Sequence, residues 1–333
     1  MTPHRICVLP GDGIGPEVIA EAVRVLKAVP LDLKFVYGEI GYGAFQKHGS
    51  PLPDETLAKI QAVDATLFGA VTTPPNIPGY FSPIVRLRQQ LKLYANLRPC
   101  KSMPHPASRA GINLLVVREN TEDLYLGRER LEDGGNTAIA EMVITRQASE
   151  NIVRKAFVLA EKRGNKKVTV VHKANVLRET CGLFRNAALE VAKEFPSMRM
   201  EEMLVDTCAM ELVRKPEQFE VIVTTNLFGD ILSDEASMLV GGLGVACSSN
   251  IGDSTGLFEP VHGSAPNLVG LHKANPIATI LSAVLMLEYL GEMEQADRIR
   301  QAVMETIRSE NVTEDLGGSL STENVTDHVI SLL

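Results

Sequence analysis

The segment Pro10-Gly-Asp-Gly-Ile-Gly-Pro-Glu17 decides how the chain folds, because it stands between the apolar run Ile6–Leu9 and an amphipathic stretch over Glu17–Ala28. A strand, a glycine-rich turn and a helix in this order form the first unit of an α/β fold. The dinucleotide fingerprint G-x-G-x-x-G would need a third glycine where Pro16 or Val18 stands. We therefore expect a tight turn that lets strand and helix pack closely, with Pro16 in the first helical turn.

The same alternation continues along the chain. Further β-rich runs are Leu33–Tyr37, Ala65–Ala70, Leu114–Val117, Lys167–Val171 and Val221–Thr225, and further helical patterns cover Pro53–Ala62 and Glu150–Arg163. This order predicts strands sandwiched between helices. Two Gly/Pro-rich zones, Leu97–Gly111 and Gly241–Gly256, interrupt the pattern. If both cross between lobes, the first and last thirds share one domain and the middle forms another.

Length and composition limit the class of protein. The 333 residues suggest about two domains at roughly 150 residues each. Hydrophobic residues make up 45% and charged residues 22%, which is typical of a soluble globular protein. The net charge of −8 argues against nucleic acid and anionic membranes as partners, so an anionic ligand would need a local cluster of cations.

The cysteines indicate a reducing compartment. Their number is odd, they are widely spread and no C-x-x-C occurs, so we expect free thiols at Cys7, Cys100, Cys181, Cys208 and Cys247. The apolar part of the N-terminus is too short for a signal peptide, and no apolar run approaches the ~18 residues of a membrane span. We therefore expect a cytoplasmic protein.

Two carboxylates stand four residues apart in Asn226-Leu-Phe-Gly-Asp230-Ile-Leu-Ser-Asp234, at an expected helix start. On one helix face these like charges repel, and a divalent cation such as Mg²⁺ or Mn²⁺ would remove that cost. The alternative is that Asp230 caps the helix and Asp234 lies favourably in its first turn. The segment alone leaves both interpretations open.

Three arginines are candidates for anion binding: Arg88, Arg98 and Arg118. On a helix Arg88 would share a face with Ile84 and Val85, which places a guanidinium beside an apolar patch. Such a pair suits a carboxylated substrate with an aliphatic segment, because arginine binds carboxylates bidentately. Taken alone, arginines are more often solvated at the surface.

Other motifs are weaker when taken singly. Tyr125 and Lys173 are possible proton carriers, since burial and neighbouring charge tune both residue types, but each alone is more often structural. The polar loop Phe258–Pro266, followed by Asn275, contains small residues that would let backbone N–H groups approach phosphates. An ordinary loop fits its composition equally well.

In this order, the motifs resemble those of the β-decarboxylating dehydrogenases, the family of isocitrate, 3-isopropylmalate and homoisocitrate dehydrogenases. The resemblance covers nearly the whole chain, through Pro10–Glu17, Tyr94–Pro99, Arg118–Glu122, His172–Val176, Asp206–Met210, Asn226–Asp234 and Glu259–Pro266. It implies a two-domain α/β fold that is not a Rossmann fold. The implied domains are a discontinuous cofactor-binding domain of residues 1–97 plus 242–333 and a central domain of residues 98–241.

The resemblance also implies the site. Metal ligands would be Asp206, Asp230 and Asp234. Substrate contacts would come from Thr72, Ser82, Val85, Arg88, Arg98, Arg118, Tyr125, Lys173 and Asn175. Cofactor contacts would come from Ala70, Val71, Thr72, Asn175, His262, Gly263, Ser264, Ala265, Asn267 and Asn275. The family places Lys173 and Asp206 across a subunit boundary, so we expect a homodimer or higher homo-oligomer with shared sites.

The implied reaction gives two residues a catalytic role. Lys173 acts as the base on the C2 hydroxyl while hydride leaves for the nicotinamide, and the Mg²⁺ or Mn²⁺ ion stabilises the enolate left by loss of CO₂. Tyr125 then supplies a proton to the carbon that carried the carboxylate.

The segment Ser82-Pro-Ile84-Val85 bears on the substrate. Isopropylmalate enzymes place two aliphatic residues at Ile84 and Val85, while isocitrate enzymes have a serine matching Ser82 and an asparagine at position 84. The combination looks most like eukaryotic homoisocitrate dehydrogenases, although some bacterial ones carry arginine at position 85. We expect homoisocitrate oxidation in lysine biosynthesis, with isopropylmalate and then isocitrate as alternatives and mixed activity credible.

Cofactor choice depends on Asn267. NAD-using relatives have an aspartate there, and NADP-using ones a lysine and a tyrosine in this region. Asparagine bonds a ribose hydroxyl but lacks the charge that repels a 2′-phosphate, so we expect NAD with weakened discrimination. A catalytically silent regulatory subunit is the alternative from another class, but it would be expected to lose a proton carrier or a metal aspartate, and all of these are present.

Overall fold

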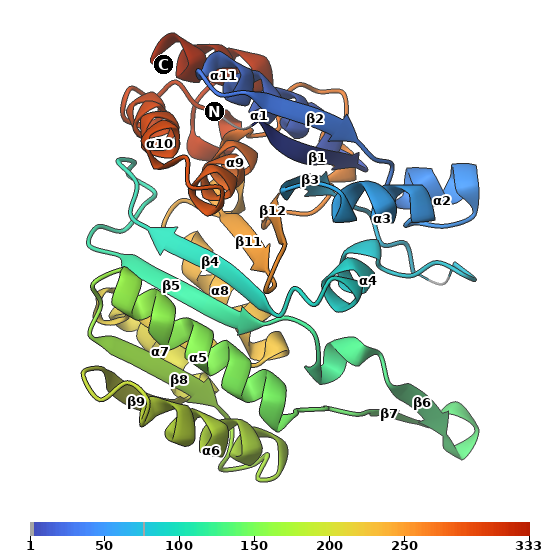
Figure 1. Cartoon of the computed structure of the whole chain (residues 1–333), viewed down its shortest axis with the longest axis vertical. Helices are drawn as coiled ribbons and strands as arrows, with labels where there is room; N and C mark the ends of the chain where they lie inside the picture. Colours follow the sequence, from blue (N-terminus) through green and yellow to red (C-terminus); the bar gives the residue numbers. More distant parts are fainter. Residues whose placement is uncertain (1–2, 76) are drawn as a thin grey trace.

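A ten-stranded sheet runs along the molecule, which the computed structural model describes over residues 3–75 and 77–333 (Figure 1). The strand order is β2-β1-β3-β12-β11-β4-β5-β10-β8-β9. The strands are β1 (His4–Gly11), β2 (Leu33–Tyr37), β3 (Ala65–Ala70), β4 (Ala95–Lys101), β5 (Asn113–Glu119), β8 (Lys167–His172), β9 (Arg199–Leu204), β10 (Val221–Thr224), β11 (Cys247–Ile251) and β12 (Gly256–Pro260). β4 is antiparallel to β11 and β5, and β11 is antiparallel to β12; the other neighbouring pairs are parallel.

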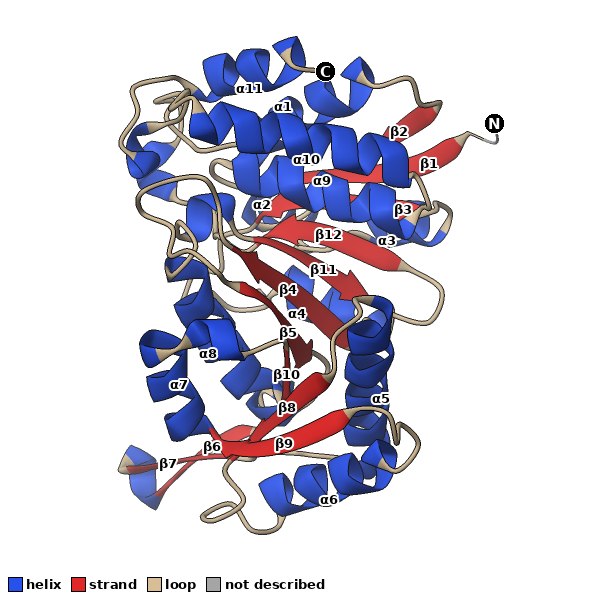
Figure 2. Cartoon of the chain, turned by 90° about the vertical axis from the view of Figure 1, so that its left-hand side faces the viewer, coloured by secondary structure: helices blue, strands red, loops and turns tan. Residues whose placement is uncertain are grey.

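Helices cover both faces of this sheet (Figure 2). They are α1 (Gly15–Ala28), α2 (Tyr42–His48), α3 (Asp54–Gln61), α4 (Pro83–Gln90), α5 (Arg146–Lys162), α6 (Thr180–Ala192), α7 (Val205–Arg214), α8 (Asn226–Met238), α9 (Ile277–Tyr289), α10 (Met293–Arg308) and α11 (Thr322–Ser331). The α/β class, every expected strand and the three expected helices are confirmed. In the part of the chain that the structure describes, no helix is long and apolar enough to span a membrane.

The apolar core divides by lobe. One cluster joins the first and last thirds of the chain and includes Ile6, Leu26, Leu67, Ile280, Ile299 and Val329. A second cluster, on the α5 side of the sheet, draws mainly on the middle and includes Val117, Phe157, Val170, Phe184 and Val223, with Ala95 joining it from β4. Both chain ends lie in the same half of the molecule (Figure 1). A domain made of the first and last thirds of the chain requires the two segments to share a core in this way. The expected domain bounds, 1–97 with 242–333 and 98–241, stay a prediction.

The glycine-rich segment after β1 packs as a tight turn. Gly11 and Gly13 have φ values of +76° and +62°, which side chains rarely adopt. A Cβ at Gly13 would lie 2.0 Å from the carbonyl oxygen of Ser264, and the Ile14 amide donates to that oxygen at 2.9 Å. The predicted close packing is confirmed, and the turn supports the loop that contains Ser264.

Two further features follow from the sequence. The polar segment around residues 132–136 connects β6 (Glu129–Glu132) to β7 (Thr137–Ala140), an exposed hairpin that projects from the central half (Figure 1). The five cysteines are free and buried, as expected.

Candidate active site

The two α8 carboxylates lie beyond the start of their helix. α8 begins at Asn226 with Thr225 as the N-cap residue. Asp230 and Asp234 therefore lie in the second and third turns, and the alternative that Asp230 caps the helix is wrong. The sequence pattern located the helix correctly but placed its start near Asp230 rather than at Asn226.

Two buried arginines reach Asp230 from neighbouring strands. Arg118, at the end of β5, is 1% exposed; its Nη1 donates to Asp230 Oδ1, while Nε and Nη2 donate to Asn226 Oδ1 at 3.0 and 2.7 Å. Arg98, on β4, donates to Asp230 at 3.1 Å and to Asp234 at 2.7 Å. A Cβ at position 229 would lie 2.6 Å from Arg118 Cγ, so this approach requires Gly229.

The charges in this cluster shift each other's ionisation. Burial and the neighbouring guanidinium groups of Arg88 and Arg98 lower the pKa of Arg118 to about 10. Burial favours the neutral form of Asp230, but Arg118 and Arg98 outweigh it, so the pKa of this carboxyl lies below its usual value. Burial raises the pKa of Asp234, and Arg98 offsets this only in part. Asp230 is thus held as an anion among cations.

Tyr125 completes the cluster. Its hydroxyl donates to Asp230 Oδ2, and the Arg118 guanidinium carbon lies 5.0 Å from its ring centroid. Burial and the hydrogen bond to Asp230 raise the pKa of the phenol. Tyr125 therefore stays protonated at neutral pH and has a proton to donate.

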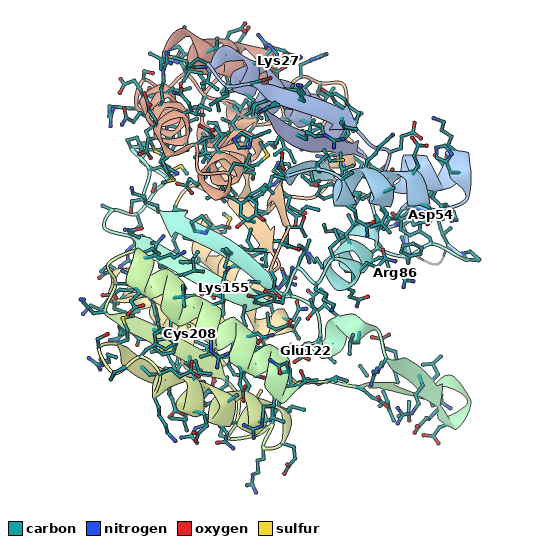
Figure 3. All side chains as sticks on the ribbon, viewed as in Figure 1. Lys27, Asp54, Arg86, Glu122, Lys155 and Cys208 are labelled. Atoms are coloured by element: carbon teal, nitrogen blue, oxygen red, sulfur yellow. The ribbon has the colours of Figure 1, made fainter. Side chains whose placement is uncertain are left out.

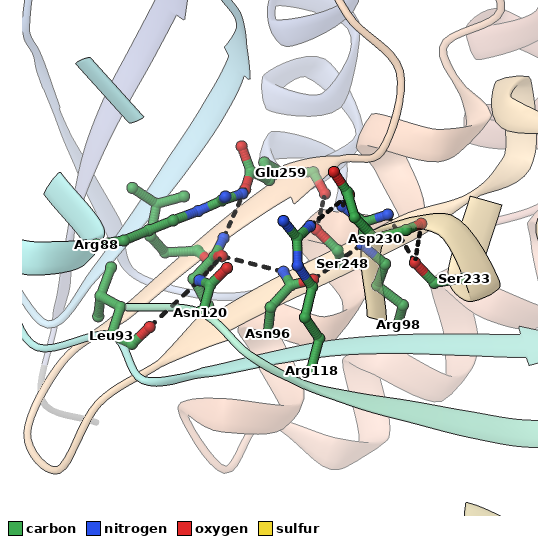
Figure 4. A network of polar contacts seen from close by, with 12 residues as sticks. Arg88, Leu93, Asn96, Arg98, Arg118, Asn120, Asp230, Ser233, Ser248 and Glu259 are labelled. Atoms are coloured by element: carbon green, nitrogen blue, oxygen red, sulfur yellow. Dashed lines mark hydrogen bonds and ion pairs between the residues drawn. The ribbon is translucent and has the colours of Figure 1, made fainter. Parts of the chain in front are cut away.

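The third arginine belongs to a buried polar network that crosses the sheet (Figure 4). Arg88, on α4, donates to Glu259 Oε1 at 2.9 Å, and Asn250 Nδ2 donates to the same oxygen at 2.6 Å. Asn250 Oδ1 accepts from Asn96 at 3.0 Å and from Asn120 at 2.8 Å. Asn96 in turn accepts from Arg98 Nε at 2.8 Å. One chain of hydrogen bonds thus links Arg88 to Arg98.

A cavity of about 200 Å³ lies over this network. Substrate and cofactor residues expected from the sequence share its wall, which includes Ala70, Val71, Arg88, Arg98, His262 and Gly263, together with Ile84 and Glu259. Ser82 is the N-cap residue of α4 and Val85 is half-buried on that helix, but neither lines the cavity. Of the aliphatic pair, Ile84 is therefore the residue beside the arginines.

The remaining cofactor residues surround the loop that follows β12. Thr72 Oγ1 donates to Ser264 Oγ at 2.8 Å, which joins the loop after β3 to the loop after β12. Asp12, which the sequence did not single out beyond its motif, accepts from the Thr72 amide at 2.9 Å. Asn267 is exposed on a short 3₁₀ turn beside Ala265. Asn275 accepts from the Ile277 amide at 3.0 Å at the start of α9.

Three residues expected in the site do not line the cavity over the arginines: Lys173, Asp206 and Asn175. Lys173 donates to Asp206 Oδ1 at 2.7 Å, which lowers the pKa of Asp206, and Asn175 is exposed nearby in sequence. Among the described residues, no hydrogen bond or ion pair joins Lys173 or Asp206 to Tyr125 or Asp230. One chain therefore presents the expected site in two parts.

Sequence reasoning missed the residues that hold the arginines. Glu259 stands in the buried strand β12 and is 7% exposed, and Asn250 in β11 is fully buried. Glu122 is also buried and accepts from the amide and the hydroxyl of Thr145, both at 2.8 Å (Figure 3). A charged residue inside an otherwise apolar strand was the available signal for Glu259, because such a group needs a partner.

The donor groups fit a divalent cation and a nucleotide. Asp230 and Asp234 offer carboxylate oxygens one turn apart, with side chains 31% and 52% exposed, which suits Mg²⁺ or Mn²⁺ with water and substrate oxygens. In the described ranges no three acidic, histidine or cysteine side chains gather to hold a metal ion, so Asp206 does not join Asp230 and Asp234 within one chain. His262 Nε2 is buried without a partner, and the space around Gly263 is open for a ligand.

Comparisons with known proteins identify the family of the chain. The family model "Isocitrate/isopropylmalate dehydrogenase" matches residues 5–329. The chain is 53% identical over 331 residues to the isocitrate/homoisocitrate dehydrogenase of Thermus thermophilus, covering 99% of this chain and 98% of the relative. It is 48% identical over 323 residues to the 3-isopropylmalate dehydrogenase of Methanothermobacter thermautotrophicus, covering 97% and 96%.

A solved structure shares the whole fold. The isocitrate dehydrogenase of Methylococcus capsulatus superposes with a TM-score of 0.96 at 43% identity, covering 99% of both chains. The expected fold and the resemblance noted in the sequence are both confirmed. The chain therefore belongs to the isocitrate/isopropylmalate dehydrogenase family of β-decarboxylating dehydrogenases.

Proposed function

We propose that this protein oxidises and decarboxylates homoisocitrate to 2-oxoadipate with reduction of NAD, in the aminoadipate route to lysine. The supporting observation is the shared cavity, where two arginines expected to bind carboxylates, Arg88 and Arg98, lie beside Ile84 and the His262 loop. Arginines satisfy the carboxylates of a tricarboxylate, and an aliphatic neighbour suits the extra methylene of homoisocitrate. Ser82, at the N-terminus of the same helix, does not line this cavity, so its contact with the distal carboxylate is part of the proposal.

The cofactor and the metal would be held by groups already described. NAD would lie along the His262–Ala265 loop with Asn267 toward its ribose, and the cation between Asp230, Asp234 and the partner's Asp206. When bound, the cation supplies a Lewis acid for the charge that develops on the substrate, and NAD accepts the hydride. Asn267 brings no negative charge to the ribose, so discrimination against NADP would be weak.

This chain's own side chains then divide the remaining work. Arg88, Arg98 and Arg118 orient the substrate carboxylates. Lys173 takes the C2 hydroxyl proton as hydride departs. After CO₂ is lost, Tyr125 gives its phenolic proton to the carbon that carried the carboxylate, a transfer that its raised pKa leaves available at neutral pH.

We also propose that the active protein is a homodimer or a larger homo-oligomer with shared sites. Large apolar side chains are exposed on α7 and α8, namely Met210, Val213, Ile231 and Met238. Several large apolar side chains exposed on neighbouring helices are typical of a protein interface. The same helices carry Asp206, Asp230 and Asp234, so an interface there would bring carboxylates of two chains together.

The decisive experiment measures kcat/KM of the purified protein for homoisocitrate, isocitrate and 3-isopropylmalate, with NAD and Mn²⁺ or Mg²⁺. We expect homoisocitrate to be preferred, with measurable activity on isocitrate because one methylene separates substrates by only ~1–3 kcal/mol. The second candidate is 3-isopropylmalate, which Ile84 favours as an apolar neighbour. A preference for 3-isopropylmalate by more than about tenfold, or about 1.4 kcal/mol, would overturn the homoisocitrate proposal. A higher kcat/KM with NADP than with NAD would overturn the assignment of Asn267.

A further inference from the structure

A second cavity, of about 360 Å³, lies where the two halves of the molecule meet. We call it the rear cavity; its wall includes Pro99, Lys101, Arg163, Cys247, Val284 and Met304. None of its lining residues, among those the structure describes, lines the cavity over the arginines. Its volume falls within the range of small-molecule sites, roughly 300–1,000 Å³.

The rear cavity lies behind the strands that carry active-site residues. Arg98 on β4 and Ser248 on β11 line the cavity over the arginines, whereas their chain neighbours Pro99 and Cys247 line the rear cavity. The two cavities thus meet adjacent residues of the same two strands, and Cys100 on β4 also lines the rear cavity. The two strands lie side by side between the halves of the molecule (Figure 2).

Much of the rear cavity is apolar. α9 contributes Leu281 and Val284, and the segment after α8 contributes Val240 and Val245. Burial raises the pKa of the Cys247 thiol to about 12, so this group is uncharged and adds to the apolar lining. A ligand for this wall needs a hydrocarbon portion.

Two exposed cations, Arg163 and Lys101, lie elsewhere on the wall around Asn113, and the Glu288 carboxylate of the same wall acts on Arg163 through its charge. Arg163 at the end of α5 donates to Asn113 Oδ1 at 2.9 Å, and Lys101 pairs with Asn113 in the β4–β5 register. Within the described part of the chain, neither cation has a carboxylate partner. Arg300, a third cation in the wall, is neutralised by Glu288 and Asp297. The cavity therefore combines an apolar wall with two exposed cations that, in the described part of the chain, form no salt bridge.

We propose that the rear cavity binds a small amphipathic monocarboxylate, with its hydrocarbon part against α9 and its carboxylate against Arg163 and Lys101. The guanidinium group binds carboxylates through charge-assisted hydrogen bonds. Because the ligand contacts the rear of β4 and β11, its binding changes the affinity for the hydroxy acid held by Arg98, and the coupling is reciprocal. The coupling rests on the proposed function, while the binding does not.

Binding is tested by calorimetric titration of the full chain with octanoate. We expect saturable binding, at least about fivefold weaker in Arg163→Gln because one charge-assisted bond is lost. Lys162→Gln is the matched control, since it removes the neighbouring exposed charge on α5 without altering the wall, and it should bind as the wild type does. Octan-1-ol, which has the same chain without the charge, should bind more weakly. Lack of saturation, or equal affinity in Arg163→Gln, overturns the proposal.

A second variant tests the location and the coupling. Met304→Trp fills the rear cavity from its half-buried rim, and because the chain has no other tryptophan its fluorescence reports whether the variant is folded. The folded variant should lose octanoate binding. Saturating octanoate should change the wild-type KM for the hydroxy acid at least about twofold and leave that of Met304→Trp unchanged. Binding without a change in KM overturns the coupling. If the chain oxidised none of the three acids, the proposed function would fall, and calorimetry would still decide the binding.

Discussion

Lys173 Nζ donates a hydrogen bond of 2.7 Å to Asp206 Oδ1, and no hydrogen bond or ion pair in the described residues joins this pair to the Tyr125–Asp230 pair. Each chain thus carries the proposed base in one place and the proposed acid in another. A second copy of the chain, docked on α7 and α8, would supply what each half lacks. This relationship leads directly to an experiment on mixed assemblies.

Mixed dimers of two inactive variants should regain activity. Lys173→Met removes the base and Tyr125→Phe removes the acid, so each homodimer should lose most of its turnover. In a dimer with one chain of each kind, one site carries both substitutions and the other carries neither. Random mixing by co-expression should therefore restore about a quarter of wild-type activity. No recovery in the steady-state rate of such mixtures would contradict shared sites.

Tyr125→Phe should separate the two halves of the reaction. The phenyl ring keeps its position beside Arg118 but has no proton to give. Overall turnover should fall by roughly 10²–10⁴-fold, the usual contribution of a general acid, while hydride transfer should fall much less. Hydride transfer alone is measured in the reverse direction, as oxidation of NADH by the β-keto acid that has not yet lost CO₂. Equal losses in both measurements would count against Tyr125 as the acid.

Asn250→Ala should weaken the hydrogen bonds that position Arg88 and Arg98 without removing a group that is proposed to contact the substrate. Glu259, Asn96 and Asn120 would each lose a buried partner, which costs ~1–3 kcal/mol per unsatisfied group. We expect a lower midpoint in urea and a higher KM for the hydroxy acid, since Arg88 and Arg98 lose their common support. Ser249→Ala, the adjacent buried residue on β11, is the control and should leave KM unchanged. An unchanged KM in Asn250→Ala would show that the network only stabilises the fold.

Local patterns predicted the elements whose residues have uniform character. Leu33–Tyr37 and Ala65–Ala70 coincide with β2 and β3. Runs of β-branched and apolar residues that are bounded by turn residues are typical of β-strands. β4 was not predicted, since it contains Asn96, Arg98 and Pro99. These polar residues are stable in a strand only because groups distant in sequence, such as Asn250 and Ser233, bond to them.

The site could be predicted in the same limited way. Residue types and spacing on α8 indicated the carboxylate pair, and residue type made Tyr125 and Lys173 candidate proton carriers. The resemblance supplied Asp206 and the role of each proton carrier. No local pattern could pair Arg88 with Glu259, 171 positions away, because long-range pairing depends on the fold. The resemblance, rather than any local pattern, supplied the expectation that Lys173 and Asp206 act across a subunit boundary.

Glu122 should make the free energy of unfolding depend on pH. Burial raises the pKa of its carboxyl from 4.5 to about 7, an effect that the hydrogen bonds from Thr145 offset only in part. Between these values the folded protein retains a proton that the unfolded chain releases, so raising the pH favours unfolding. The loss begins near pH 4.5, is complete above pH 7 and reaches up to ~3 kcal/mol.

Urea denaturation at pH 5, 6, 7 and 8 tests this against Glu122→Gln. The glutamine amide can still accept from the Thr145 amide and donate to its hydroxyl, so the fold should persist. Because this variant has no carboxyl to titrate, its stability relative to wild type should rise steadily from pH 5 to 7 and then level off. Glu161→Gln, an exposed substitution at the end of α5, controls for the loss of one negative charge. A constant difference between Glu122→Gln and wild type at every pH would mean that the Glu122 carboxyl does not titrate in this range, and its burial would then need a different electrostatic explanation.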